Sequence, residues 1–508
     1  MNVKKLTAVA LALMLVSAAA IHSPCALFGG GKKDGTAAPK GPAELRYGLT
    51  SEPTTLDPLS AANTADGRSI LFNVFEGLVK PDTDGNMLGA IAESWTIEQN
   101  GLVYAFTLRE GVKFHDGSVV TLRDVEFSLN AAMEAKFSGF TQIEKVEQSG
   151  SRDIRITLKA PDTEFLPYLT IGIVPVGNAD REKNPIGTGP FIIESYIPQQ
   201  SLVLKKNPHY WKAGFPKLDQ VTIVFVADSD ALLLNLRGGN IDGAGVTGSL
   251  VQQIDPARFD IVSGNSNTVQ LLALNNAVKP LDDIRVRQAV NYAIDVPEII
   301  ETAFYGKGEP SGSALIPGLT RYYNKALANP YPADLNRARA LLAEAGYPRG
   351  FNLEITVPSN YTMHVDTAQV VVNQLARAGI SATIKLVDWA TWLSDTYRGR
   401  KYEATIISFD ANNVSPRSFL SRYRSDSGSN FINFKSADYD RAYDAAQRET
   451  NDDRRAAFYQ EAQKAISDAA ASVYIQDIRS FKVFPRGRYG GVVNYPLYVL
   501  DFSTVYRN

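Results

Sequence analysis

Histidine, cysteine and serine side chains are the first candidates for catalysis or metal binding, and their spacing in this sequence supports neither. The four histidines stand at positions 22, 115, 209 and 364, without the H-E-x-x-H pairing that holds zinc on one helix. The single cysteine, Cys25, excludes an intramolecular disulfide and a cysteine-based zinc site. No G-x-S-x-G elbow presents a nucleophilic serine. We therefore expect no catalytic residue, no metal site, no cofactor and no enzymatic activity.

The composition is that of an ordinary globular protein. Of the 508 residues, 44% are hydrophobic and 21% are charged. The 52 Lys and Arg residues nearly balance the 54 Asp and Glu residues, so the net charge is −2 and no basic excess indicates a nucleic-acid partner. At roughly 100–200 residues per domain, the length leaves room for about two or three domains with cores of their own.

The N-terminus predicts export. Two lysines precede an apolar run at residues 7–20, which is shorter than the roughly 20 residues of a bilayer-spanning helix and suits a signal peptide. We place the signal peptide at residues 1–25. Residues 26–43 are rich in Gly, Lys, Ala and Pro, a composition that predicts a flexible tether.

Cys25 stands where a lipid anchor would be attached. Pro24 fits a lipoprotein signal poorly, and cleavage after Ala18 or Ala20 is the alternative. We expect a periplasmic or otherwise extracytoplasmic protein whose membrane contact, if any, is a lipid on Cys25. A detergent partition assay separates the two alternatives, because a mature form that stays in the aqueous phase carries no anchor.

The remainder of the chain predicts a mixed α/β fold. Strand-like alternation of apolar and polar residues occurs at residues 103–109, 153–158, 201–205, 221–225, 268–274 and 351–357. Helical spacing of apolar residues occurs at residues 286–294, 371–378 and 458–466. Thr121 and Asp124 have the spacing of a capping box that opens a helix, and Asp334 can cap a helix that ends before Gly346.

Several long stretches resemble the family 5 extracellular solute-binding proteins, the peptide and nickel class served by ABC importers. The longest reads AESW at residues 92–95, followed by GLVYAFTLREGVKFHDGSVVTLRDVEFS at residues 101–128. The others, in the order of the family, are LRYGLTSEPTTLDPL at 45–59, NVFEG at 73–77, NPIGTGPF at 184–191, NPHYW at 207–211, LDDIRVRQAVNYAID at 281–295 and LLAEAGYPRG at 341–350.

Most of these motif residues have a structural interpretation. His115 lies beside Asp116 and Gly117, where a hydrogen-bonded turn is favoured over a metal ligand. Arg285 and Arg287 flank a helix start next to two aspartates, where ion pairing is favoured. Two tryptophans, at 389 and 392, are spaced for one helix face, and we expect core packing in preference to a ligand-stacking pair.

The resemblance implies the fold of a two-lobed periplasmic-binding-protein-like clamshell of type II, with an extra inserted subdomain. A ligand that touches both lobes favours the closed form, because those contacts exist only on closure. Two chain crossings, near residues 268–274 and 481–489, would form the hinge. The expected segments are residues 44–77, 187–265 and 479–508 for the first lobe, 78–186 for the inserted subdomain, and 266–478 for the second lobe.

The resemblance also implies a ligand site. In peptide-binding relatives an aspartate captures the α-ammonium group of the ligand, and Asp410 matches that place after an apolar strand at residues 404–408. The alternative is that Asp410 caps a local turn with Asn412 and Asn413, and two extra residues before Pro416 leave the register open. The remaining expected ligand contacts, placed by approximate match to cleft positions of relatives, are Phe409, Asn412, Arg424, Thr64, Phe140 and Tyr489.

The function that the resemblance implies is that of a monomeric receptor that delivers peptides to the permease of an ABC importer. No basic residue follows the strand at residues 351–357, so longer peptides are favoured over dipeptides. One alternative is the same role for a non-peptide solute such as a nickel chelate or a glycoside. Another is an exported chaperone-like holdase or a sensor, and a hydrolase would have to turn over a peptide.

Overall fold

The structure is a computed structural model that describes residues 42–246, 248–410, 415–495, 497 and 499–508. Contacts divide the chain after Gly41, and every described helix and strand lies in the unit Pro42–Asn508. The predicted signal peptide, tether, lipid on Cys25 and ligand contact at Asn412 fall outside the described residues. Within the described part, no helix combines the length and apolar character that a bilayer crossing requires.

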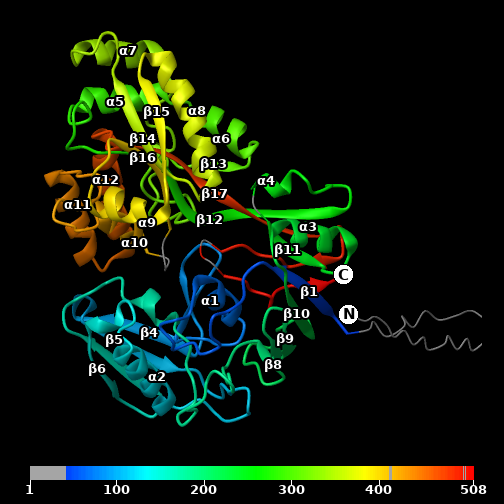
Figure 1. The fold of residues 1–508 in the computed structure, drawn as a ribbon. Coiled ribbons are helices and arrows are strands. Elements are labelled where there is room, and N and C mark those ends of the chain that lie inside the picture. The colour runs from blue at the N-terminus through cyan, green and yellow to red at the C-terminus, as the bar shows by residue number, and fades with distance from the viewer. Residues whose placement is uncertain (1–41, 247, 411–414, 496, 498) are drawn as a thin grey trace, which may run out of the picture. The chain divides into compact units, whose positions relative to one another are not determined.

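An 11-stranded mixed sheet runs in the order β15-β14-β16-β12-β17-β11-β1-β10-β9-β8, with β13 paired to β17. Its central members, β12 (Phe259–Leu274) and β17 (Ser472–Pro485), are antiparallel and much longer than the rest (Figure 1). The other strands are β1 (Glu44–Leu49), β8 (Phe191–Ile197), β9 (Ser201–Lys206), β10 (Gln220–Phe225), β11 (Gly243–Val246), β13 (Gly308–Pro310), β14 (Asn352–Pro358), β15 (Ser381–Val387) and β16 (Ala404–Asp410).

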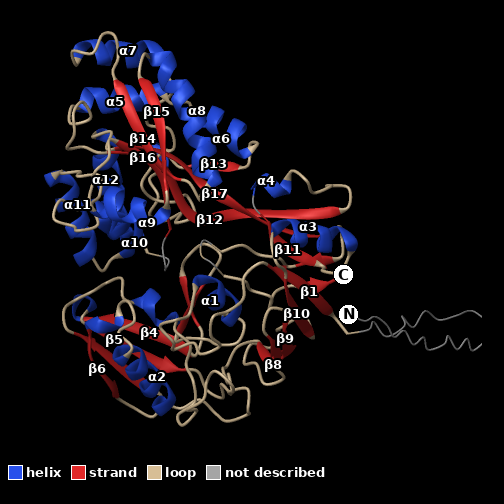
Figure 2. Ribbon diagram, in the orientation of Figure 1, coloured by secondary structure: helices blue, strands red, loops and turns tan. Residues whose placement is uncertain are grey.

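Helices cover both faces of the sheet at the β14–β16 end (Figure 2). Successive residues of a strand point to opposite faces, and in β12 the side chains of Leu271 and Ala273 enter one cluster while Leu272 and Leu274 enter the other. This double burial explains the long apolar runs of β14 and β16. One face carries α5 (Ile284–Ala293), α6 (Val296–Phe304), α7 (Leu335–Glu344) and α8 (Thr362–Ala378), and the other carries α11 (Ala437–Arg448) and α12 (Asp452–Asp468).

The β1 end of the sheet has two further apolar clusters. In β1, Leu45 and Tyr47 point into the first cluster with residues of α1 (Ala65–Leu71). The second cluster packs α3 (Ser229–Gly238) against β11 and β17, and α4 (Gly248–Val251) contacts β17. Gly48 allows β1 to lie close to this second cluster, because a Cβ atom at Gly48 would lie 2.5 Å from Ile241 Cδ1.

A separate antiparallel sheet, in the order β4-β5-β7-β6, packs against α2 (Leu122–Glu134). Its strands are β4 (Ala92–Glu98), β5 (Val103–Leu108), β6 (Ile143–Gln148) and β7 (Asp153–Leu158). Both halves of the predicted capping box form, since Thr121 and Asp124 each hold a backbone N–H of the other. Two short pairs complete the strands: β2 (Val79–Pro81) with β3 (Met87–Gly89), and β18 (Tyr489–Gly490) with β19 (Tyr506–Arg507).

The remaining helical segments are short. They are α9 (Trp389–Thr391), which continues into π-helical Trp392–Arg398, α10 (Pro416–Leu420), and 3₁₀ turns at Gln99–Gly101, Phe140–Gln142, Leu166–Thr170, Lys325–Leu327 and Ser421–Tyr423.

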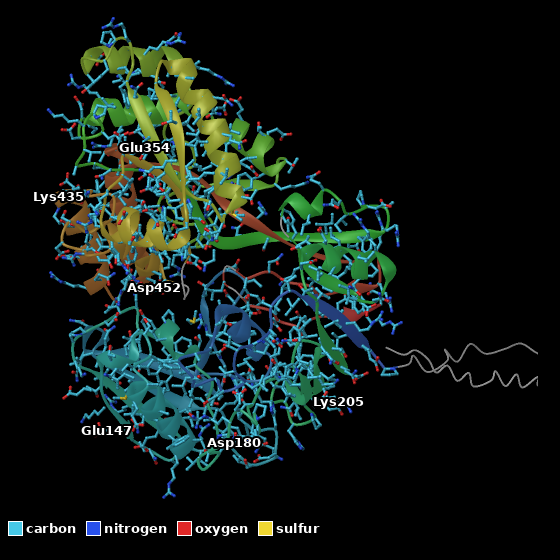
Figure 3. All side chains as sticks on the ribbon, in the orientation of Figure 1. Glu147, Asp180, Lys205, Glu354, Lys435 and Asp452 are labelled. Carbon is cyan, nitrogen blue, oxygen red and sulfur yellow. The ribbon has the colours of Figure 1, made fainter. Side chains whose placement is uncertain are left out.

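Charged side chains of both signs are spread over the surface, in keeping with the small net charge (Figure 3). Two of the labelled residues, Lys205 and Glu354, form exposed ion pairs with Glu194 and Lys385. Such solvent-exposed pairs each contribute roughly 0–1 kcal/mol. They therefore govern solubility more than the choice of fold.

Candidate functional site

Three parallel strands end at one edge of the large sheet. β14 pairs in parallel with both β15 and β16, so the carboxyl ends of the three strands meet. Each end has a polar or aromatic side chain at or close after it: Tyr361 stands three residues after β14, Trp389 stands two residues after β15, and Asp410 is the last residue of β16. Open α/β sheets bind ligands outside the carboxyl ends of their strands, so this edge is the candidate site.

A continuous series of aromatic rings lines the edge, and we call it the aromatic row. Trp389 stacks on Trp392 at 5.1 Å between ring centroids with an interplanar angle of 4°. Tyr361 packs edge-on against Trp389 at 5.4 Å. The row consists of Tyr361, Trp389, Trp392, Tyr397, Phe431 and Phe409, with neighbouring centroids 5.1–6.5 Å apart.

Two members of the row differ sharply in exposure. Trp392 is 2% exposed, and its Nε1–H donates to Thr405 Oγ1 at 3.0 Å. Trp389 is 37% exposed. The prediction that this pair belongs to the core therefore holds for Trp392 and is wrong for Trp389, which presents a ring face or edge to solvent on top of a buried partner.

Opposite charges flank the far end of the aromatic row. Asp410 is exposed, and the guanidinium of Arg422 lies 3.9 Å from the centroid of Phe409. Arg422 is held there because its Nε donates to the carbonyl of Phe419 at 3.1 Å. A cation over an aromatic face is stabilised by the ring quadrupole. The edge thus offers a guanidinium and apolar rings on the face of Phe409, while Asp410, the next residue of β16, points to the opposite face.

His364 supports this edge from below. Gln476 Nε2 donates to Gln270 Oε1 at 2.8 Å, and this bond turns the Gln270 amide nitrogen toward His364 Nδ1, 3.1 Å away. His364 Nδ1 therefore accepts, and Nε2–H faces Ser408 Oγ at 3.3 Å. Burial lowers the pKa of His364 to about 4. The imidazole is thus neutral, and it contacts β16 close to the carboxyl end of that strand.

Four other predicted ligand contacts have structural partners. Phe140 is 2% exposed in the core of the β4–β7 sheet, and Thr64 Oγ1 caps α1 by accepting from Gly67 N–H. The hydroxyl of Tyr489 donates to the carbonyl of Glu44 at 2.8 Å. Arg424 forms ion pairs with Asp426 and Asp444. These local partners cannot be recognised from an approximate sequence match to relatives.

The predictions made for the histidine and the two arginines of the family motifs have different outcomes. His115 Nδ1 accepts from Gly187 N–H at 3.2 Å and its Nε2 faces the carbonyl of Gly189, as expected of a turn histidine. Arg285 forms the predicted ion pair with Asp283. The same prediction is wrong for Arg287, which is buried and donates to backbone carbonyls, including that of Ala469.

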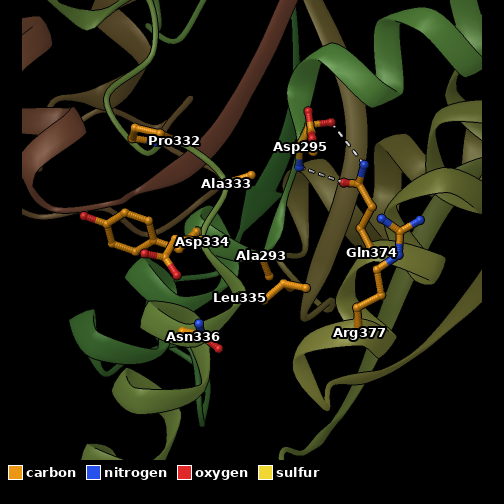
Figure 4. Close-up of a pocket in the computed structure, with 10 residues that line it drawn as sticks. Ala293, Asp295, Pro332, Ala333, Asp334, Leu335, Asn336, Gln374 and Arg377 are labelled. Carbon is orange, nitrogen blue, oxygen red and sulfur yellow. Dashed lines mark hydrogen bonds between the residues drawn. The ribbon is translucent and has the colours of Figure 1, made fainter.

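A cavity of about 650 Å³ opens elsewhere, at the opposite end of α8 (Figure 4). α8 starts beside the end of β14 and is 17 residues long, so Gln374 and Arg377 near its carboxyl end lie roughly 20 Å from Tyr361. Two polar side chains of the cavity are paired within the protein: Gln374 bridges the backbone of Asp295, and Arg377 pairs with Glu298. The cavity is distinct from the candidate site.

Among the described residues, no group of three or more His, Cys, Asp or Glu side chains is arranged to hold a metal ion. The chemistry available at the candidate site is therefore recognition by charge, hydrogen bonding and ring contact.

Comparison with known proteins identifies the family. The model of bacterial extracellular solute-binding proteins, family 5 Middle, matches residues 86–431, more than half of the chain. The chain belongs to this family. Family 5 proteins bind small solutes and work with the permeases of ABC importers; they are binding proteins and not enzymes. The resemblance stated from the sequence motifs is confirmed.

Relatives of this family 5 protein share its sequence and fold. The glutathione-binding protein GsiB of Shigella flexneri is 30% identical over 352 residues, which cover 66% of this chain and 68% of GsiB. HbpA2 from Haemophilus parasuis superposes with a TM-score of 0.82 at 23% identity over 92% of this chain and all of its own. DppA from Helicobacter pylori, in complex with the peptide STSA, has a TM-score of 0.68 and 26% identity over 91% of this chain and 98% of its own. The mixed α/β binding-protein fold is thereby confirmed.

Proposed function

We propose that this family 5 solute-binding protein captures oligopeptides between two lobes and delivers them to an ABC permease. The observation that carries the proposal is the position of Asp410, an exposed carboxylate at the edge where three parallel strands end, beside the aromatic row. GsiB and the peptide complex of DppA support the choice of peptides, since glutathione is itself a modified tripeptide.

The proposed lobes are residues 44–77, 187–265 and 479–508 on one side and 266–478 on the other, with residues 78–186 as an inserted subdomain. β12 and β17 support this division, because β12 carries the chain from the β1 end of the sheet to the β16 end and the antiparallel β17 carries it back. Register shifts between Asn265 and Val269 and between Gln270 and Leu271 interrupt their pairing. Bulges of this kind weaken a ladder locally and suit a hinge.

Asp410 anchors the α-ammonium group of the peptide in this proposal. A charge-assisted hydrogen bond of that type contributes about 1.5–3 kcal/mol. The aromatic row gives the side chains of the peptide an apolar surface, at about 25 cal/mol for each Å² removed from water. Arg422, already positioned over Phe409, faces the same edge and can pair with a carboxylate of the ligand.

Calorimetric titration with tetraalanine and with N-acetyl-tetraalanine tests the amine anchor. The wild-type protein should prefer the free amine at least tenfold, and Asp410→Asn should abolish that preference. Asp426→Asn is the matched control, because it neutralises an exposed carboxylate that pairs with Arg424 in the same part of the chain. An unchanged preference in Asp410→Asn rejects the role of Asp410. Glutathione serves as a third probe of solute class.

We also propose that the protein is a periplasmic monomer, and that Cys25 is the only point of lipid attachment. The extracellular family supports export. Light scattering tests the monomer, and detergent partition of wild type against Cys25→Ser tests the lipid.

A further inference from the structure

Residues 162–164, which follow β7, contact helices that lie more than 250 residues further along the chain. Arg417 of α10 donates two hydrogen bonds to the carboxylate of Asp162, Nη1 to Oδ2 at 2.6 Å and Nη2 to Oδ1 at 2.5 Å. This bidentate geometry is the strongest form of an arginine–carboxylate pair. Asp162 is 3% exposed, so the pair is screened very little by solvent.

Glu164 makes a second set of contacts with the same helices. Its carboxylate accepts hydrogen bonds from the hydroxyls of Ser415 and Tyr459, and from Gln447 Nε2 at 3.2 Å. Thr163 Oγ1 donates to the carbonyl of Gln447 at 3.3 Å. We call the whole group the clasp; it consists of Asp162, Thr163, Glu164, Ser415, Arg417, Gln447 and Tyr459.

Separating Asp162 and Glu164 from their partners in the clasp would cost free energy. Glu164 is 6% exposed, and its burial raises its pKa, while the nearby guanidinium of Arg417 acts in the opposite direction. A buried carboxylate is tolerated only when it is paired and hydrogen-bonded. If α10 and α12 moved away, Asp162 and Glu164 would both have to exchange these partners for water.

The clasp is also joined covalently to the candidate site. Ser415 is the N-cap of α10, and its hydroxyl accepts from Arg417 N–H while it donates to Glu164. Ser415 lies five residues after Asp410, a span of at most about 18 Å of extended chain.

We propose that Asp162 and Glu164 are positioning residues for solute capture: through Arg417 and Ser415 they fasten the inserted subdomain to the second lobe. The proposal rests on the proposed two-lobe function. All contacts in the clasp are between protein groups, so it favours the fastened form by the same amount for every solute. Because the apparent dissociation constant is the intrinsic one divided by the fraction of molecules in the competent form, loss of the clasp weakens the binding of all ligands together.

Distance measurement by pulsed electron resonance tests the clasp directly. Spin labels are placed on cysteines introduced at Glu110 and Asp438, which are 79% and 76% exposed in their side chains, in full-length Cys25→Ser protein. Arg417→Ala should shift the distance distribution to longer values and raise the dissociation constant for tetraalanine at least tenfold. Adding Asp162→Asn to Arg417→Ala should change that constant less than twofold further, because the pair is already broken.

Two further variants separate positioning from simple loss of stability. The charge swap Asp162→Arg with Arg417→Asp should restore at least part of the short distance. Asp242→Asn removes a buried carboxylate paired with Arg46 and Arg488 away from the clasp, and should leave both distance and affinity unchanged even if the melting temperature falls.

Ser415→Ala provides a milder test should Arg417→Ala fail to fold, since it removes only one hydroxyl from Glu164. The proposal is overturned if Arg417→Ala, or Ser415→Ala in its place, has the same distance distribution as the wild type and a dissociation constant within twofold of the wild-type value. If tetraalanine does not bind, or if Asp410→Asn has no effect, the amine anchor fails. The distance measurement then decides on the clasp alone.

Discussion

Acidification should destabilise this protein through the buried imidazole of His364. The ring is 1% exposed, and burial lowers its pKa from an ordinary value of 6.5 to about 4. Gln270 presents an N–H to Nδ1, so a proton added at that nitrogen would place donor against donor. The folded protein therefore resists a proton that the unfolded chain accepts.

The sign and size of the effect follow from linkage. Between pH 6.5 and pH 4 the unfolded chain binds more protons than the folded one, so stability is full above this window and is lost as the pH falls through it. For a single group, a pKa difference of this size contributes about 3.4 kcal/mol to the free energy of unfolding. About 2 kcal/mol of this contribution is lost between pH 7 and pH 5.

Urea denaturation at several pH values between 7 and 4.5 measures this loss. His364→Gln has no titrating ring, so the difference in unfolding free energy between wild type and His364→Gln should shrink by about 2 kcal/mol from pH 7 to pH 5. His115→Gln removes a second imidazole whose pKa burial also lowers to about 4; its difference from wild type should shrink in the same way, while the contribution of His364 is retained. Parallel curves for wild type and His364→Gln would refute the reasoning, since the imidazole would then titrate alike in both states.

Two further predictions concern a tight turn before β14 and the packing of the two stacked tryptophans. Gly350 has φ +75° and a Cβ there would overlap the carbonyl oxygen of Gly379, so Gly350→Ala should cost about 3 kcal/mol or more in urea denaturation, whereas Gly428→Ala, with open space around it, should change stability by less than about 0.5 kcal/mol. Trp392→Ala should lower the unfolding free energy by about 3–5 kcal/mol because it empties a core position, and Trp389→Ala by less than about 1 kcal/mol; equal losses would contradict the difference in their exposure.

Local patterns were enough to predict many elements. The alternation at residues 153–158 matches β7, the capping box at Thr121 opens α2, and Asp334 caps α7 by accepting from Arg337 N–H. Each of these depends on residues a few positions apart, where sequence spacing and spatial distance agree.

The long strand β12 was only half predicted. Its second part, residues 268–274, alternates and was recognised, but its first part contains Gly264 and a run of Asn and Ser without an apolar period. Residues 259–265 pair with β17 through their backbones, which requires no apolar period. A rule that depends on hydrophobic period cannot detect a strand of this kind.

The candidate site was predicted in part. Asp410 was recognised through the family resemblance, whereas the exposure of Trp389 depends on the ring stacked beneath it and has no local signature. The pairing of Asp162 with Arg417 joins residues 255 positions apart, and nothing in the sequence around either one distinguishes it from an ordinary surface charge.

The paired strands β12 and β17 set the mechanical character of the molecule. They are matched from Phe259 opposite Pro485 to Ala273 opposite Ser472, so slippage by one residue would turn every side chain to the wrong side. Torsion at the two register shifts disturbs few backbone pairs by comparison. The two register shifts are therefore the places where a change of twist between the two strands disturbs the fewest backbone pairs.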